Sequence, residues 1–184
     1  MPDGVLEVLQ SMPLDVPASV PKIEKAAQSL YDLLNVKFEG GIQDIKAISD
    51  RLRYYNEQHD LFAKRLVKFF KTQFADMTSK QTSASSARTL ASSHLTSPNT
   101  TIGALSLPRH DEIYTFLTTY KSLVLLCRHQ SPREHLEICT EYQNSMGNLV
   151  SKDLSRFFET LKANHLLKRP NPDPSARKKI EIDC

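Results

Sequence analysis

The sequence has little glycine and no tryptophan, with only five glycines among 184 residues. Enzymes of the α/β class need glycine in tight turns and in the loops that bind phosphate, so this composition argues against such a fold. Long apolar runs are also lacking. The uncharged apolar run at 122–127 is far shorter than the roughly 20 residues that span a bilayer, so no transmembrane helix is expected.

An excess of one charge is lacking as well. The 24 Lys and Arg residues face 21 Asp and Glu residues, and the net charge is only +3. A dedicated nucleic-acid binder would cluster its basic residues, so we expect no nucleic-acid partner. The three cysteines are an odd number, and the first 20 residues hold three prolines rather than the apolar run of a secretory leader. A reducing, cytoplasmic setting is expected.

Regular apolar spacing begins after residue 18 and predicts a first helix. Ser19 ahead of Pro21 is a start signal, and Gly40-Gly41 is a stop signal. Between them, apolar residues alternate in steps of three and four, as in a helix that packs against another helix: Val20, Ile23, Ala27, Leu30 and Leu34. The preceding residues, 1–18, are predicted to be an irregular arm.

A longer apolar series predicts a second helix over about 43–76, roughly 50 Å long. A helix of that length needs another long helix beside it, so we expect its apolar residues to bind a partner helix. We call these residues the predicted seam: Ile45, Ile48, Leu52, Tyr55, Phe62, Leu66 and Phe69, with His59 between them. Several are bulkier or more polar than the residues of a dimeric zipper. The apolar stripe also widens toward its end, which indicates a multi-helix bundle there.

The pattern breaks at residues 77–108. Thirteen of the 24 residues between 78 and 101 are Ser or Thr, and a segment with so little to bury cannot offset the entropy lost on ordering. The sequence therefore predicts a disordered Ser/Thr-rich loop. A tail rich in proline and basic residues is predicted at 166–184.

Helical spacing returns over 109–165 and predicts an antiparallel pair of helices. The turn CRHQSPREHLEIC, residues 127–139, has two interpretations. Ser131, Pro132 and Glu134 match the start code of a helix, while Cys127 and Cys139 fall in the apolar series of the two arms. Those cysteines, with His129 and His135, could alternatively hold zinc. Their order is not a familiar zinc spacing, so we interpret the segment as a turn and expect no metal.

The organisation predicted from these signals is all-α. A long helical hairpin or coiled coil at 19–76 leads into a helical bundle of the rod type that the helix pair at 109–165 completes, with the Ser/Thr-rich loop between them. No Ser-His-Asp set, paired carboxylates or phosphate loop is present, so we expect neither an enzyme nor a cofactor.

A basic amphipathic segment at 63–71 offers a second function. Lys64, Arg65, Lys68 and Lys71 surround apolar residues, as in helices that lie on anionic membrane surfaces. The same pattern is typical of the solvated flank of a bundle helix, and acidic residues continue on this helix. His59 could act as a proton switch or ligand, although a packed histidine explains its place equally.

Two stretches resemble a known family: RYYNEQHDLFAKRLVKFFKTQF, residues 53–74, and LPRHDEIYTFLTTYKSLVLLCRHQSPREHLEICTEYQNSMGNLVSKDLSRFFETLKA, residues 107–163. They resemble the fungal form of the exocyst subunit family Sec-three, exocyst component one. The shared features are R-x5-H-x-L-F-A-x-R-L, L-P-x-H-x-x-I-Y and Y-x6-L-x-x-K-D-L-x-R-F-F, separated by a serine-rich insertion. The resemblance covers roughly 20–165.

The resemblance implies a non-catalytic subunit of a complex that tethers post-Golgi secretory vesicles to the plasma membrane. Its subunits are rods of stacked helical bundles that assemble through long helices, at sites of polarised secretion. The family's module for phosphoinositides and Rho-type GTPases has no counterpart here. Membrane and GTPase contacts are therefore expected of the full-length protein and are assigned to no residue of this chain, which we interpret as a fragment.

Overall fold

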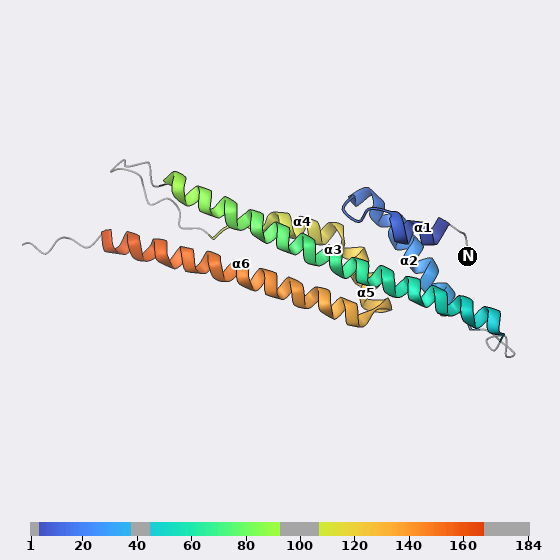
Figure 1. Cartoon of the computed structure of the whole chain (residues 1–184). Helices are drawn as coiled ribbons and strands as arrows, with labels where there is room; N and C mark the ends of the chain where they lie inside the picture. Colours follow the sequence, from blue (N-terminus) through green and yellow to red (C-terminus); the bar gives the residue numbers. More distant parts are fainter. Residues whose placement is uncertain (1–3, 38–44, 93–106, 168–184) are drawn as a thin grey trace, which may run out of the picture.

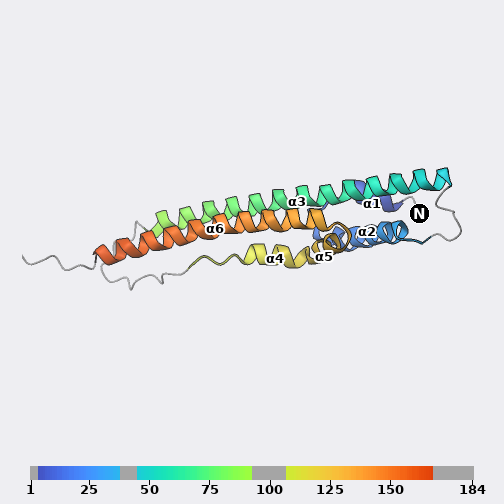
Figure 2. The ribbon, with the colours of Figure 1, turned by 90° about the horizontal axis from the view of Figure 1, so that it is seen from below.

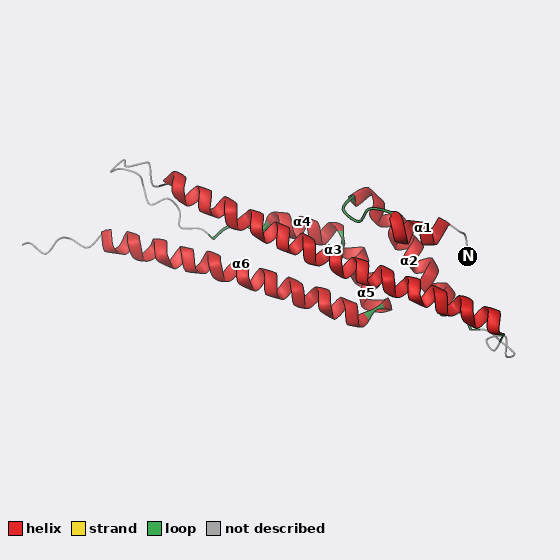
Figure 3. Ribbon diagram, in the orientation of Figure 1, coloured by secondary structure: helices red, strands yellow, loops and turns green. Residues whose placement is uncertain are grey.

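The computed structural model describes residues 4–37, 45–92 and 107–167, with the side chains of 84–92 and 164–167 left out of the description. Every regular element in these ranges is a helix, as Figure 3 shows. The all-α prediction is confirmed. The elements are α1 (Gly4–Ser11), a 3-10 turn η1 (Pro17–Ser19), α2 (Val20–Leu34), α3 (Lys46–Ser92), α4 (Asp111–Thr119), α5 (Lys121–Gln130) and α6 (Pro132–Leu167).

The helix α3 is the spine of an elongated molecule (Figure 1). Its 47 residues correspond to a length of about 70 Å. Helix α2 runs back along the first part of α3, and α4 and α5 run back along the later part, so that α4, α5 and α2 follow one another on one side of α3 (Figure 2). Helix α6 then runs in the same direction as α3 and beside it.

The predicted start of the first helix is confirmed, since Ser19 is the N-cap of α2 and proline occupies its first turn. The helix ends earlier than the glycine signal predicts. Its last residue is Leu34, and the side chain of Asn35 donates a hydrogen bond to the carbonyl oxygen of Tyr31 at 2.8 Å. The backbone N–H of Asn35 donates to the same oxygen at 3.1 Å, so this residue closes the last turn with both its main chain and its side chain. The predicted stop at 40–41 lies outside the described residues.

The prediction of an irregular arm at 1–18 is wrong for its first part. Residues 4–11 form α1, and Leu9 and Leu14 are buried against α2 and α3. The side chain of Arg65 on α3 donates hydrogen bonds to the carbonyl oxygens of Leu9, at 2.6 Å, and of Met12. A cation at this position also suits the negative end of the helix dipole. The arm is held by a long-range contact that its own sequence does not signal.

The prediction of a loop beginning at residue 77 is also wrong, because α3 continues to Ser92. The hydroxyls of Thr78, Thr82 and Ser83 each donate to the carbonyl oxygen four residues earlier, at 2.8–3.0 Å. Side chains bonded in this way are accommodated within a helix. Burial of Met77 adds packing to this stretch. The rest of the predicted loop, 93–106, and most of the predicted tail lie outside the described residues.

The first arm of the predicted helix pair is broken at Tyr120 into α4 and α5. Thr118 and Thr119 donate to carbonyl oxygens four residues earlier, a type of bond that bends helices. The break places the Tyr120 ring in the core, 4.6 Å from the Phe116 ring. Other aromatic rings join this cluster: Phe69, Phe70, Phe74 and Tyr142.

Candidate functional site

The predicted seam lies mostly inside this chain. Tyr55, Phe62 and Leu66 are buried, and Phe69 packs half-buried against the rings of Phe116 and Tyr120. The helices that cover them are α1 and α2 over the first part and α4 and α6 over the later part, together with Tyr120 between α4 and α5. The prediction that these side chains bind a partner is therefore wrong for the middle and end of the seam, because a partner could reach them only by opening the bundle.

The N-terminal end of the seam is less covered. Ile45 is exposed, and Ile48 and Leu52 are half-buried. His59, which the sequence leaves as a switch or a packed residue, is buried, with its ring 6.4 Å from the ring of Tyr31. A tight fit between α2 and α3 explains this position without a ligand.

The four basic residues at 64–71 do not form one surface. Arg65 is half-buried and binds the carbonyls at the end of α1. Lys71 binds the carboxylate of Glu137 on α6 at 2.6 Å, and this bond raises the pKa of Lys71. Lys64 and Lys68 are exposed. The structure thus uses two of the four cations to hold helices together, and the predicted anionic-surface contact loses half of its charge.

The segment 127–139 is a turn, as predicted. Helix α5 ends at Gln130, α6 begins at Pro132, and Ser131 between them is buried. Cys127 is buried in the core, and burial raises its pKa to about 12. Cys139 is half-buried with its sulfur 3.6 Å from Nε2 of His135. Across the part of the chain that the structure describes, no three His, Cys, Asp or Glu side chains gather in a way that could hold a metal.

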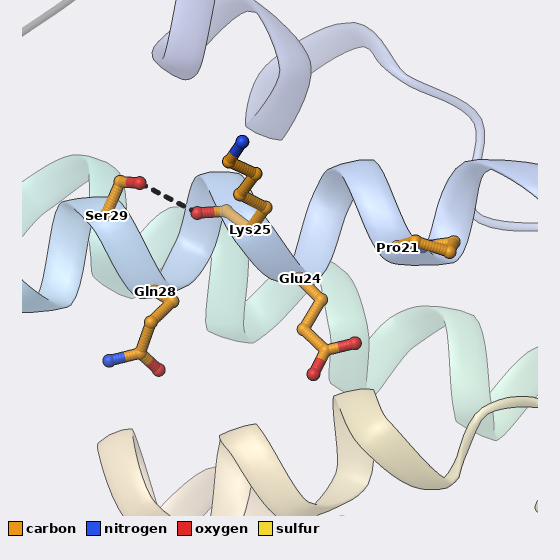
Figure 4. Close-up of a pocket in the computed structure, with 5 residues that line it drawn as sticks. All are labelled: Pro21, Glu24, Lys25, Gln28 and Ser29. Carbon is orange, nitrogen blue, oxygen red and sulfur yellow. Dashed lines mark hydrogen bonds between the residues drawn. The ribbon is translucent and has the colours of Figure 1, made fainter.

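The surface hollows of the described residues are shallow and carry no converging reactive groups. One of about 340 Å³ is lined by residues of α2 alone (Figure 4): Pro21, Glu24, Lys25, Gln28 and Ser29. Lys25 extends away from Glu24 and Gln28 in this view, so its ammonium and their polar groups do not meet. Another, of about 480 Å³, lies over Phe116 and Tyr120 beside Asp15, Asp111 and Glu112. Neither holds a nucleophile positioned beside a base.

An exposed apolar surface instead lies along the second half of α6. Val150, Leu154, Phe158 and Leu161 are 41%, 37%, 54% and 41% exposed. With Gly147 and the half-buried Phe157 they form what we call the outer α6 face. Its members at 147, 150, 154, 157 and 161 alternate in steps of three and four, which is the spacing of a helix that packs along another helix. The face is about 20 Å long.

The same part of α6 has a second, inner face. Leu149 and Asp153 are buried, and each precedes a member of the outer face by one residue, or 100° around the helix. Helix α4 begins at Asp111, and His110 just before it contacts Asp153. Beyond that level α6 runs on beside α3 (Figure 2), so one flank of α6 has a neighbour while its outer face has none among the described residues.

Sequence reasoning missed the outer α6 face. Its residues are predicted only as part of the helix pair at 109–165 that completes the bundle, without separation of an exposed face from a buried one. The signal was present, because apolar residues at 149 and 150, and again at 157 and 158, make the stripe too wide for one neighbouring helix. The contact between His110 and Asp153 had no sequence signal, since more than 40 residues separate them.

Comparison with family models, with curated proteins and with solved structures gives no match for this chain. None of the helices, over the residues that the structure describes, has the length and apolar character required to cross a membrane. The geometry of the chain itself, together with the resemblance in its sequence, is therefore the basis for the function.

Proposed function

We propose that this chain is a non-catalytic part of an exocyst subunit, which helps to tether post-Golgi secretory vesicles to the plasma membrane by packing its helices against those of other subunits. One observation carries the proposal. The outer α6 face is apolar, exposed and spaced for a helix, and apolar surface of this kind is typical of sites that bind proteins. In this proposal the protein is cytoplasmic and acts peripherally at sites of polarised secretion.

The rod shape supports the same function. Helix α3 carries α1 and α2 near one end and α4, α5 and α6 along the rest (Figure 1), so distant surfaces are held at fixed separations by one continuous helix. A tether needs such spacing and needs no chemistry. The alternative function, a peripheral membrane-binding helix at 63–71, is weakened because Arg65 and Lys71 already bind groups within the chain.

The experiment is co-elution of the full 184-residue chain with the long N-terminal helices of the other exocyst subunits. We expect a complex that Leu154→Asp and Leu161→Asp each abolish, because a carboxylate would have to be buried at the new interface. Leu61→Asp is the matched control, since Leu61 is 58% exposed on α3 and precedes Lys71, which contacts Glu137 near the start of α6. Its complex should be retained.

All three variants must keep the helical circular dichroism of the parent chain. A complex that survives both α6 substitutions would contradict the assignment of this surface. Failure of the parent chain to bind any subunit would contradict the tethering function itself. Variants of the predicted seam, such as Phe62→Asp or Leu66→Asp, are unsuitable for this purpose because those side chains are core residues and their replacement would unfold the chain.

A further inference from the structure

A buried carboxylate lies where α4 begins. Asp153 on α6 is 5% exposed, and neither of its carboxylate oxygens accepts a hydrogen bond from a described residue. A charge in such a place is strongly unfavourable unless a partner of opposite charge or a proton is present. Nε2 of His110 lies 3.4 Å from Oδ2 of Asp153. This contact gives Asp153 a cation only when the histidine is protonated.

The contact of the other ring nitrogen of His110 indicates which protonation state of the ring suits this position. Nδ1 lies 2.6 Å from Oε1 of Gln81 on α3. A carbonyl oxygen can only accept a hydrogen bond, so Nδ1 carries the proton of this contact. A neutral ring would then present the bare lone pair of Nε2 to the Asp153 carboxylate, with two acceptors facing each other. The imidazolium, with protons on both nitrogens, can donate to Gln81 and present a positive charge to the Asp153 carboxylate at the same time.

Charged groups lie on each element around His110. On α4, directly after His110, Asp111 and Glu112 are exposed acids. On α3, Lys80 is bound to Asp76 at 2.6 Å. On α6, Arg156 lies one turn beyond Asp153 and has interactions of its own.

We propose that His110 and Asp153 form a proton-dependent latch, in which the imidazolium fastens the start of α4 to α3 and α6. Loss of the proton as pH rises leaves a buried carboxylate facing a lone pair, and the start of α4 separates from the two long helices. Ile113 and Leu149, which are buried at this level, then become accessible next to the outer α6 face. The latch does not rest on the proposed tethering function.

The sign of the pH dependence follows from proton linkage. In the proposed latch the facing carboxylate favours the imidazolium only in the folded chain, so the latch would stabilise the fold at low pH and its contribution would be lost as pH rises. Histidine side chains titrate in the range of about pH 5 to 8. We expect the melting temperature to fall by roughly 3–5 °C more in the parent chain than in Asp153→Asn between about pH 6 and pH 8.5.

The decisive measurement is nitrogen NMR of the parent chain labelled at histidine, with His110→Gln used to identify the His110 signals. We expect both ring nitrogens of His110 to remain protonated at a pH at which the ring of His129, which is exposed at the end of α5, has become neutral. Asp153→Asn should remove this difference. His129→Gln is the matched control and should leave the His110 signals and the excess fall in melting temperature unchanged.

A neutral His110 with its proton on Nε2 at neutral pH would overturn the proposal, because the Gln81 amide would then be donating to Nδ1 and no extra proton would be held. Equal pH dependence of melting in the parent chain and in Asp153→Asn would overturn it as well. If Asp153→Asn does not fold, the spectrum of the parent chain alone decides between the two protonation states.

Discussion

Phe70 and Phe158 are the same residue type on two long helices that run side by side, and their surroundings are opposite. Phe70 is fully buried between the rings of Phe69, Phe74, Phe116 and Tyr120, whereas Phe158 is 54% exposed on the outer α6 face. The difference comes from what lies on each helix. The middle of α3 is wrapped by helices on several sides, while the second half of α6 lies beyond the start of α4. Apolar character alone therefore does not determine whether a face is covered within this chain; the neighbouring helices determine that.

The largest expected difference in the free energy of unfolding comes from removing each of the two rings in turn. We expect Phe70→Ala to lower the free energy of unfolding by about 3–5 kcal/mol, because it opens a cavity in a cluster of aromatic rings. Phe158→Ala is the matched control and should change it by less than about 0.5 kcal/mol, as for other exposed sites. Urea denaturation of each variant provides the measurement. Similar losses for both would mean that Phe158 is buried in the free chain.

The second prediction concerns the hydrogen bonds by which Arg65 on α3 holds the end of α1. Replacing Arg65 with methionine, which retains much of the aliphatic stem, should lower the free energy of unfolding by about 1–3 kcal/mol, because it removes charge-assisted hydrogen bonds to two carbonyls. Lys64→Met is the control, since Lys64 at the preceding position is exposed. Hydrogen exchange should become faster in α1 for the Arg65 variant. Unchanged protection of α1 would show that apolar packing alone holds it.

These contacts show how far the sequence predicts the fold. The three-four spacing predicts a helix between Ser19 and Gly40-Gly41, a second over about 43–76 and a helix pair over 109–165, since that signal depends on nearby residues. It could not show that α1 packs on α3, because Arg65 reaches Leu9 across more than 50 residues. It also could not show which stripe is covered. Leu66 and Leu154 have equivalent patterns around them, but only the first has helices over it.

The candidate site was predictable in part. The width of the apolar stripe at 149–158 indicates that α6 has more apolar surface than one neighbouring helix can cover. The sequence does not show which part of that surface stays exposed. The Ser/Thr-rich composition misled the assignment of 77–92, since hydroxyls bonded within their own helix removed the polar groups that a loop would have exposed to water.

The third prediction concerns how the stability of the chain depends on pH through the buried thiol of Cys127. Burial raises the pKa of this thiol to about 12, above the usual value of about 8.5 in an unfolded chain. The folded state therefore keeps its proton while the unfolded state loses it, so stability falls as pH rises. Between about pH 7.5 and pH 9.5 the parent chain should lose about 1 kcal/mol more than Cys127→Ala does. Burial also raises the pKa of Tyr120, and both chains share that contribution.

Thiol labelling gives an independent measurement of the same burial. With the other cysteines replaced by serine, Cys127 should react at about pH 8 roughly a thousandfold more slowly than an unfolded thiol, because so little thiolate is present. Cys139, half-buried beside His135, serves as the comparison in a chain that keeps it alone and should react faster. Rapid labelling of Cys127 would show that α5 opens readily from the bundle.

The smallest expected effect is that of Gly147→Ala, which should act differently on the free chain and on a complex formed through the outer α6 face. Gly147 lies within α6, and a methyl group added there would meet nothing within 4 Å. Gly147→Ala should therefore raise the free energy of unfolding by about 0.5–1 kcal/mol, since alanine loses less backbone entropy in a helix. If a partner helix approaches closely at this position, the same methyl group should weaken the complex even though the free chain is more stable. Denaturation of the free chain and co-elution with the partner measure these opposite changes. A gain in both would place the partner's contact nearer Leu161 and away from the glycine.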